Sequence, residues 1–262
     1  MVDLFRHNGI TCSALSLLLT CGCISRPWIF KKNPDTRTPS LAGGSVVTAQ
    51  NGKRTAYGFF TKRGDRLAVL FHGQASTMAR EANFGNVFAG HGFSVLLVEY
   101  AGYGLAKKES PSESGIYDDS EALILQIQEK HNLLPEKTVI WGRSLGSGVA
   151  AELILRKRGS AAILVTPYTS IAAVAEHKSI PLLPRLFVWD NFNTRSKAAD
   201  IDAPVLLIGA GKDTLTPVAM TEELARKFPN AQTIILPRAN HFNFHAHLTG
   251  AHWRQIIEFA RQ

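Results

Sequence analysis

Six short apolar runs alternate with longer amphipathic stretches along this chain, and this alternation limits the possible folds more than any other feature. The runs are continuously apolar, which predicts strands buried on both faces, as in a parallel sheet covered by helices. Strands and helices that alternate in this way indicate a doubly wound α/β domain. The apolar runs lie at residues 67–71, 93–100, 138–142, 161–167, 204–210 and 232–237, and the helical stretches at 80–90, 116–131, 145–158, 216–228 and 248–261.

Two further strand-like segments come before these runs, at residues 45–50 and 54–61, and they flank Asn51-Gly52. An Asn-Gly pair between two strands is a strong signal for a two-residue hairpin. With 262 residues, the chain is long enough for one large domain with a substantial core. We therefore predict a single α/β domain over residues 45–262 whose sheet begins with an antiparallel hairpin.

All three cysteines, Cys12, Cys21 and Cys23, lie before the predicted domain, which therefore contains no thiol. That distribution excludes disulfides, a cysteine nucleophile and cysteine-bound zinc in the domain. The apolar stretch at residues 10–19 is shorter than the roughly 20 residues that a helix needs to cross a bilayer. We expect residues 1–22 to be a secretory signal peptide.

Gly22-Cys23 resembles the junction of a bacterial lipobox, in which the cysteine is diacylated and becomes the new N-terminus. The resemblance implies a lipid on Cys23 and a protein anchored in the cell envelope, on its periplasmic or extracellular face. The alternative is an apolar N-terminus that stays attached. Residues 23–44 are rich in Pro, Gly and positive charge, which predicts a tether. Lys31 and Lys32 would then attract anionic lipid headgroups.

The charge balance is basic, with 29 Lys and Arg against 21 Asp and Glu and a net charge of +8. Such a balance is compatible with nucleic acid, with an anionic membrane surface or with solubility alone. No dense Lys/Arg helix and no nucleic-acid motif accompany it. We therefore expect no nucleic-acid partner and name the membrane surface, reached through the N-terminal lipid, as the partner. The oligomeric state does not follow from these features.

Gly142-Arg143-Ser144-Leu145-Gly146 is the segment that carries the most chemical information. It lies between a predicted strand and a predicted helix, which is the placement that a serine nucleophile requires. A sharp turn there lifts the Ser144 Oγ above the sheet, and the two glycines remove side chains that would clash in the turn. The helix N-terminus behind the serine directs backbone N–H groups at a developing oxyanion.

With these segments the chain resembles the α/β-hydrolase superfamily from Ser45 to Gln262. The resemblance implies an α/β-hydrolase fold, with a mostly parallel sheet of about eight strands, helices on both faces and a short cap segment. It also implies two oxyanion donors, the N–H of Leu145 and that of Gln74, with Ala75 as the alternative to Gln74. Residues 71–75 resemble the family's oxyanion loop, 100–104 its glycine-rich turn, 211–217 its acid loop and 240–242 its histidine loop.

The order of Ser144, Asp213 and His241 along the chain is the order of that family's catalytic triad. Asp213 follows the predicted strand 204–210, so it lies with Ser144 at the carboxyl edge of the sheet, where open α/β sheets bind ligands. His241 follows the last predicted strand and precedes the final helix, so it can reach both residues. We expect Ser144 as the nucleophile, His241 as the base and Asp213 as the residue that orients the imidazole.

Several neighbouring side chains allow two interpretations. His245 and His247 follow His241 and suggest a metal cluster, but no carboxylate or cysteine accompanies them, so we predict no metal and no cofactor. Arg143 either presents its charge to an anionic substrate or forms a local ion pair. His72 is expected to bond the loop backbone rather than to act as a second base.

The connection between the predicted strands 161–167 and 204–210 spans only residues 168–203. An insertion of this length is too short for a lipase-sized lid, so we expect a shallow and open site. Its apolar side chains either pack on the sheet or form an acyl-chain groove beside Ser144. The candidates for that groove are Tyr168, Leu183, Phe187 and Trp189.

In its short cap and loop motifs, the chain is similar to the small-lid hydrolases that include serine-aminopeptidase-like enzymes and protein depalmitoylases. This resemblance implies a serine hydrolase that cleaves an ester or thioester of a small-molecule or acylated substrate through an acyl-enzyme. One alternative is a peptidase or amidase with the same triad, because the triad does not choose the leaving group. Another is a membrane-tethered binding protein that kept the fold and lost activity.

Overall fold

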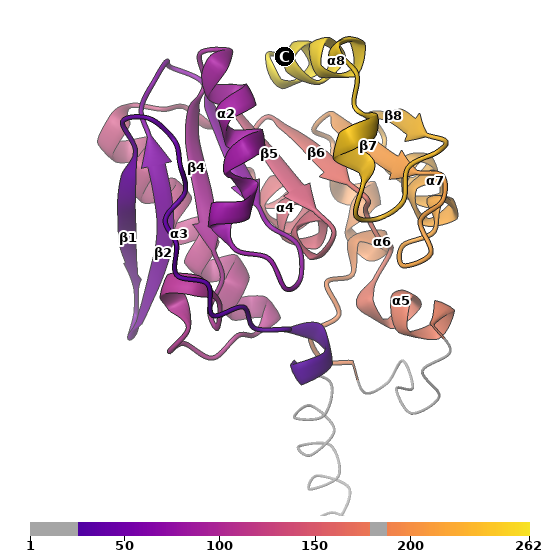
Figure 1. Ribbon diagram of the computed structural model, residues 1–262, viewed down its shortest axis with the longest axis horizontal. Helices are drawn as coiled ribbons and strands as arrows, with labels where there is room; N and C mark the ends of the chain where they lie inside the picture. Colours follow the sequence, from indigo (N-terminus) through magenta and orange to yellow (C-terminus); the bar gives the residue numbers. More distant parts are fainter. Residues whose placement is uncertain (1–25, 179–187) are drawn as a thin grey trace, which may run out of the picture.

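A single mostly parallel sheet organises the chain in the computed structural model, which describes residues 26–178 and 188–262 (Figure 1). The strand order is β1-β2-β4-β3-β5-β6-β7-β8. The β1–β2 and β2–β4 pairs are antiparallel, and all other neighbouring strands are parallel. The predicted fold class is confirmed. The strands are β1 (Ser45–Asn51), β2 (Arg54–Thr61), β3 (Leu67–Phe71), β4 (Ser94–Glu99), β5 (Thr138–Arg143), β6 (Ala161–Val165), β7 (Val205–Ala210) and β8 (Ala231–Leu236).

Helices cover both faces of the sheet, as the alternation of strands and helices predicts (Figure 1). α2 and α8 pack on one face, and α3, α4 and α7 pack on the other. Short 3-10 turns such as η1 (Met78–Glu81) and η6 (Phe244–His247) connect the elements near the carboxyl edge. The helices are α2 (Ala82–Gly90), α3 (Glu113–His131), α4 (Leu145–Leu155), α5 (Ile171–His177), α6 (Thr194–Lys197), α7 (Val218–Lys227) and α8 (Gly250–Ala260).

The core consists of two apolar clusters, one on each side of the sheet. Neighbouring residues of one strand point to opposite sides, so that Ile140 joins the first cluster and Trp141 the second. Both faces of β3 to β7 are therefore buried, which explains why their sequences are continuously apolar.

The first hairpin differs slightly from the expectation. Asn51 still pairs with Arg54, so the loop consists of Gly52 and Lys53 rather than Asn51 and Gly52. Gly52 has φ of +59°, a left-handed conformation that glycine adopts without steric cost. The turn therefore lies one residue later than the Asn-Gly pattern predicts.

The described part of the expected tether, residues 26–44, packs on the domain, which departs from a free tether. Ile29, Phe30 and Leu41 are buried among core residues. The side chain of Arg26 donates to Asp190 at 2.8 Å. The Pro, Gly and Lys content of this segment suggested solvent exposure, but its few apolar side chains gain more by burial in the two core clusters.

No helix among residues 26–178 and 188–262 combines the length and the apolar character that a membrane span requires.

The close approach of α4 to the sheet predicts a large cost for any side chain at Gly142. A Cβ there would lie 2.1 Å from the Gly146 carbonyl oxygen, a backbone atom that cannot move aside. We expect Gly142→Ala to lower the free energy of unfolding by about 1–3 kcal/mol in a denaturant titration. Gly90→Ala is the control, because a Cβ at Gly90 meets nothing within 4 Å. Equal stability of the two variants would contradict this tight contact.

Candidate active site

Ser144 lies in a sharp turn between β5 and α4. β5 ends at Arg143, α4 begins at Leu145, and Ser144 itself has φ of +51° and ψ of −118°. This conformation is unusual for a residue with a side chain and costs of order 1–3 kcal/mol. A Cβ on Gly146 would lie 2.5 Å from the Phe71 carbonyl oxygen, so only glycine allows α4 to begin this close to β3.

The structure brings Ser144, His241 and Asp213 into one hydrogen-bonded chain. Ser144 Oγ lies 2.9 Å from His241 Nε2, and His241 Nδ1 lies 2.7 Å from Asp213 Oδ2. All three residues are nearly buried, with exposed fractions of 8%, 5% and 6% in the order Ser144, His241 and Asp213. They follow β5, β8 and β7, so the loops after three parallel strands of one sheet bring them together at its carboxyl edge, with β6 lying between β5 and β7. The arrangement places a hydroxyl, an imidazole and a carboxylate in series, the order in which a nucleophile, a base and an orienting carboxylate can act.

The Asp213 carboxylate is held in its ionised form by hydrogen bonds. Its Oδ1 accepts the backbone N–H groups of Leu215 and Thr216, each at 2.8 Å. Burial by itself raises the pKa of Asp213. The hydrogen bond from His241 and those from the backbone lower the pKa by more than burial raises it, so the net pKa lies below its usual value. The carboxylate therefore stays charged and favours the Nδ1–H tautomer of His241.

Thr216 is a residue of this site to which the sequence analysis assigned no role. Its Oγ1 lies 3.0 Å from Asp213 Oδ2, 3.2 Å from the Thr166 carbonyl oxygen and 3.2 Å from His241 Nδ1. The hydroxyl thus borders both partners of the His–Asp pair. Its position three residues after Asp213 in the acid loop is a sequence signal that could have suggested such a contact.

Gln74 and Ala75, the two residues considered for the oxyanion loop, form the centre of a tight turn after β3. The turn is closed by the Ser76 N–H, which donates to the Gly73 carbonyl at 3.2 Å, and Ala75 has φ of +56°. Leu145 is the first residue of α4, so its N–H has no partner within the helix. A Cβ built on Gly73 would lie 3.3 Å from Ser144 Cβ, which shows that this loop lies against Ser144.

Contacts on two sides hold the loop of Gln74 and Ala75, the expected oxyanion loop, in place. On one side, the Gln74 side-chain amide donates to the carbonyls of Trp28 at 2.7 Å and Ile29 at 2.6 Å. On the other, the buried His72 ring places Nε2 at 3.0 Å from Glu99 Oε1, while Nδ1 lies 2.8 Å from the Gly73 carbonyl oxygen. His72 therefore contacts the loop backbone, as the sequence analysis expects.

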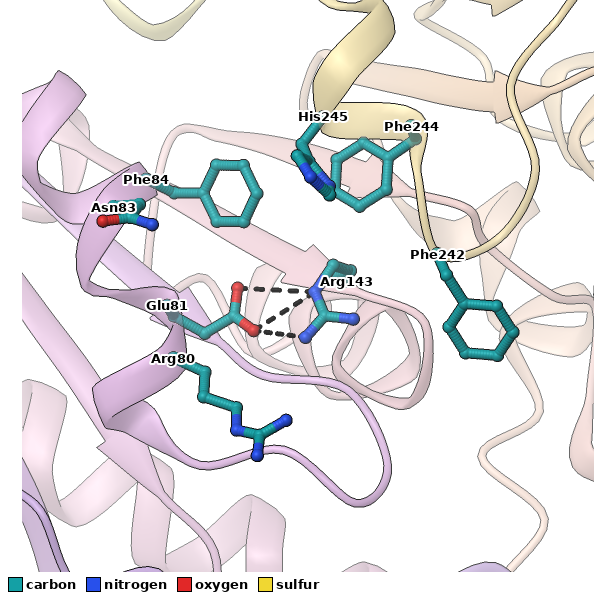
Figure 2. Close-up of a pocket in the computed structure, with 8 residues that line it drawn as sticks. All are labelled: Arg80, Glu81, Asn83, Phe84, Arg143, Phe242, Phe244 and His245. Atoms are coloured by element: carbon teal, nitrogen blue, oxygen red, sulfur yellow. Dashed lines mark hydrogen bonds and ion pairs between the residues drawn. The ribbon is translucent and has the colours of Figure 1, made fainter.

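Arg143 forms a local ion pair, one of the two alternatives left open by the sequence. Its guanidinium binds the buried carboxylate of Glu81, with the Nε–H at 3.1 Å from Oε1, and Nη2 also donates to Ser76 Oγ at 3.2 Å. Beside this pair lies a cavity of about 250 Å³, bounded by η1, the start of α2, Arg143 and the segment that follows His241 (Figure 2).

Of the four groove candidates, two can be placed. Tyr168 is only 2% exposed, and its hydroxyl donates to the Leu145 carbonyl at 3.2 Å, so it supports α4 from below instead of lining an open groove. Trp189 is 55% exposed. Leu183, Phe187 and the predicted lipidation residue Cys23 lie outside the described residues.

The histidines after His241 do not converge. Within the described ranges, no group of three or more His, Cys, Asp or Glu side chains is arranged to hold a metal ion. His245 lines the cavity of Figure 2, and its ring packs edge-on against Phe244 at 5.8 Å.

Comparisons with known proteins show that the chain is similar to hydrolases. Residues 63–190 match the family profile described as serine aminopeptidase, S33, and residues 184–248 match the profile described as alpha/beta hydrolase fold. The chain is 33% identical to an uncharacterized protein of Mycobacterium tuberculosis over 257 residues, which cover 92% of this chain and 90% of that protein. It is 29% identical to human alpha/beta hydrolase domain-containing protein 17B over 171 residues, 58% of this chain and 57% of that one.

Solved structures share the fold at low sequence identity. An esterase of Pyrococcus furiosus superposes with a TM-score of 0.70 at 16% identity and covers 87% of this chain and 98% of its own. The acylaminoacyl peptidase of Pyrococcus horikoshii superposes with a TM-score of 0.67 at 14% identity, over 82% of this chain and 41% of its own. The same architecture thus occurs in an esterase and in a peptidase.

The contacts of Thr216 predict that its hydroxyl assists the His–Asp pair. We expect Thr216→Val to slow labelling of Ser144 by a fluorophosphonate about fivefold, because loss of one hydrogen bond is worth about 1 kcal/mol. Thr216→Ser keeps the hydroxyl and should label close to the wild-type rate. A Val variant that labels at the wild-type rate would show that the hydroxyl does not influence the pair.

Proposed function

The chain belongs to the α/β-hydrolase superfamily and is a hydrolase, and from that membership we propose that it is a serine hydrolase that cleaves carboxylic esters or thioesters through an acyl-enzyme. The observation that carries the proposal is the buried chain of hydrogen bonds from Ser144 through His241 to Asp213. Three side chains from separate loops meet at hydrogen-bond distance, beside two backbone donors, and this is the geometry that acyl transfer needs.

In the acylation step, Ser144 Oγ attacks the carbonyl carbon of the substrate while its proton passes to His241 Nε2. Asp213 accepts the Nδ1–H and stabilises the imidazolium that forms. The carbonyl oxygen becomes an oxyanion, which the N–H groups of Gln74 and Leu145 stabilise. The intermediate then collapses, the bond to the leaving alkoxide or thiolate breaks, and His241 gives its proton to that group.

Deacylation repeats the same chemistry with water as the nucleophile. His241 Nε2 takes a proton from water, the hydroxide attacks the acyl carbon, and the oxyanion again binds the two N–H groups. Collapse releases the carboxylic acid, and the proton returns from His241 to Ser144 Oγ. No cofactor is required, since every proton is transferred between the serine, the histidine, water and the leaving group.

The charge beside Ser144 supports an ester or thioester over a peptide substrate. An aminopeptidase receives a cationic N-terminal amine, which a free carboxylate would have to bind. Glu81 is the carboxylate that borders the cavity, and its oxygens already accept hydrogen bonds from Arg143. The remaining charge at the cavity is positive, from Arg80, and it repels an amine.

A binding protein without activity is the other alternative, and the intact hydrogen-bonded chain argues against it. A strained serine and a buried carboxylate both cost stability. A protein that only bound a ligand would gain nothing from holding this serine and this carboxylate at hydrogen-bond distance from His241.

Trp189 is proposed as a contact for the acyl chain. It is exposed, and its neighbour Asp190 bonds Arg26 at the start of the segment that also supports the oxyanion loop. The cap is short, so the site is expected to be open, to prefer short and medium acyl chains and to need no lipid interface for activity.

The proposal predicts that Ser144 is the residue that reacts with a fluorophosphonate probe. Ser144→Ala should abolish labelling and ester hydrolysis, whereas Ser196→Ala, at an exposed serine of α6, should change neither. Asp213→Asn should still label but turn over p-nitrophenyl butyrate about 10⁴-fold more slowly, because the imidazole loses its orienting charge. Labelling and turnover are measured on the same preparations, with thermal unfolding as a check on folding.

Labelling of the Ser144→Ala variant at the wild-type level would overturn the assignment of the nucleophile. Hydrolysis of aminoacyl amides without hydrolysis of esters or thioesters would instead favour the peptidase alternative.

We also propose that the protein is held at the cell envelope by a lipid on Cys23. Mass spectrometry of the mature protein should then find Cys23 as the N-terminal residue with acyl chains attached. Cys23→Ser should release the protein from the membrane fraction or block its processing, whereas Cys12→Ser should have neither effect, because residue 12 lies in the removed peptide. A mature protein that begins at an unmodified Met1 would contradict the proposal.

A further inference from the structure

The cavity beside the Arg143–Glu81 ion pair contains N–H donors that no group in the described parts of the chain accepts. A guanidinium carries five N–H donors in a fixed plane. In Arg143, the Nε–H donates to Glu81 and Nη2 donates to Glu81 and Ser76. Nη1 has no hydrogen-bond partner in the described parts of the chain, and Figure 2 shows it directed away from Glu81, toward the side of the cavity where Phe242 lies.

These donors lie close to the proposed reaction centre. A Cβ built on Gly73 would lie 3.0 Å from Arg143 Nη1 and 3.3 Å from Ser144 Cβ, so both atoms border the same small space. Glu81 fixes the guanidinium through two of its nitrogens and is itself buried. Nη1 is therefore held in place before a ligand arrives, so binding costs little side-chain entropy.

A second cation adds to the positive charge of the cavity. Arg80 borders it, is exposed, and forms no ion pair with any residue in the described ranges. The carboxylate whose pKa it influences, Asp35, is already bound by Arg37 at 2.6 Å. Glu81 and Arg143 neutralise each other, so Arg80 gives the cavity a net positive charge, which favours an anionic ligand.

The other walls of the cavity are aromatic. Phe84 and Phe244 stack with their ring centres 5.7 Å apart, and Phe242 is 76% exposed at the far side (Figure 2). Apolar rings next to fixed N–H donors suit a ligand with a short apolar stem and an anionic end. The volume of about 250 Å³ has room for a group of that size.

We propose that this cavity is a subsite for a carboxylate group carried on a short apolar stem by the ester or thioester substrate. The proposal rests on the hydrolase function proposed above and narrows its substrate class. Arg143 Nη1 donates to the carboxylate, Arg80 adds electrostatic attraction at the cavity mouth, and the aromatic side chains cover the stem. The carboxylate belongs either to the acyl part or to the leaving group, and the experiment separates these two cases.

The first measurement compares esters that differ in one charge. For the acyl part, the kcat/KM for p-nitrophenyl hemiglutarate is divided by that for p-nitrophenyl valerate. For the leaving group, 4-acetoxybenzoate is compared with methyl 4-acetoxybenzoate. Each rate is corrected for spontaneous hydrolysis. At least one ratio should favour the anionic ester by about tenfold, the effect of one charge-assisted hydrogen bond.

Variants then test whether the cavity causes the preference. Arg80→Gln should reduce the favoured ratio several-fold and make it less sensitive to salt. Lys227→Gln is the matched control, because it removes the same charge from an exposed position at the end of α7 and should leave both ratios unchanged. Ratios at or below one for both pairs, or equal effects of the two variants, would overturn the proposal.

A binding measurement separates this proposal from the hydrolase function. Monoethyl glutarate is titrated into the Ser144→Ala variant by calorimetry, with ethyl valerate as the neutral ligand. Saturable binding of the anionic ligand that Arg80→Gln weakens supports the subsite even if no ester is hydrolysed. Hydrolysis of neutral esters without such binding supports the function and overturns the subsite.

Discussion

The close contact between the start of α4 and the strands β3 and β5 is the constraint on which the rest of the site depends. At Gly142 and Gly146, the backbones approach so closely that no other residue fits. This contact forces Ser144 into a left-handed conformation, which directs its Oγ out of the sheet and toward His241. The cost of that strain is met by the packing of α4 against the sheet, where Val149, Leu153 and their neighbours are fully buried.

The parallel sheet also positions the site, because it places the carboxyl ends of its strands at one edge. β6 separates β5 from β7 and β8, yet the carboxyl ends of all these strands lie at one edge of the sheet. The loops after β5, β7 and β8 carry Ser144, Asp213 and His241, respectively. The loops themselves are short. Asp213 comes three residues after the end of β7, and His241 five residues after the end of β8. Short loops on a rigid sheet hold the three side chains at fixed distances from one another.

Most of the sheet order and the grouping of Ser144, Asp213 and His241 could be predicted from the sequence, because two patterns in it point to the same fold. Apolar runs locate the strands, and the segment around Ser144 locates the turn between one strand and one helix. Asp213 and His241 then follow from their positions after later strands. Other features depend on long-range contacts that leave no local pattern. Tyr168 looks like a surface aromatic residue after a strand, but a glycine at position 148 makes room for its ring beneath α4, and the side chain is buried there. The orientation of Arg143, which leaves its Nη1 facing the cavity, is set by the ion pair with Glu81, a residue 62 positions away.

The segment at residues 26–33 has a consequence for how the molecule is handled. It lies at the edge of the sheet where Ser144 lies, and Gln74 and Ala75 both bond to it, through Trp28, Ile29 and Asn33. The other end of the chain follows α8, which packs on the opposite part of the sheet, far from that edge (Figure 1). A bulky group attached just before Arg26 would therefore lie near the segment that holds the loop of Gln74 and Ala75. A label on an exposed residue just after α8, such as Gln262, would lie away from this loop.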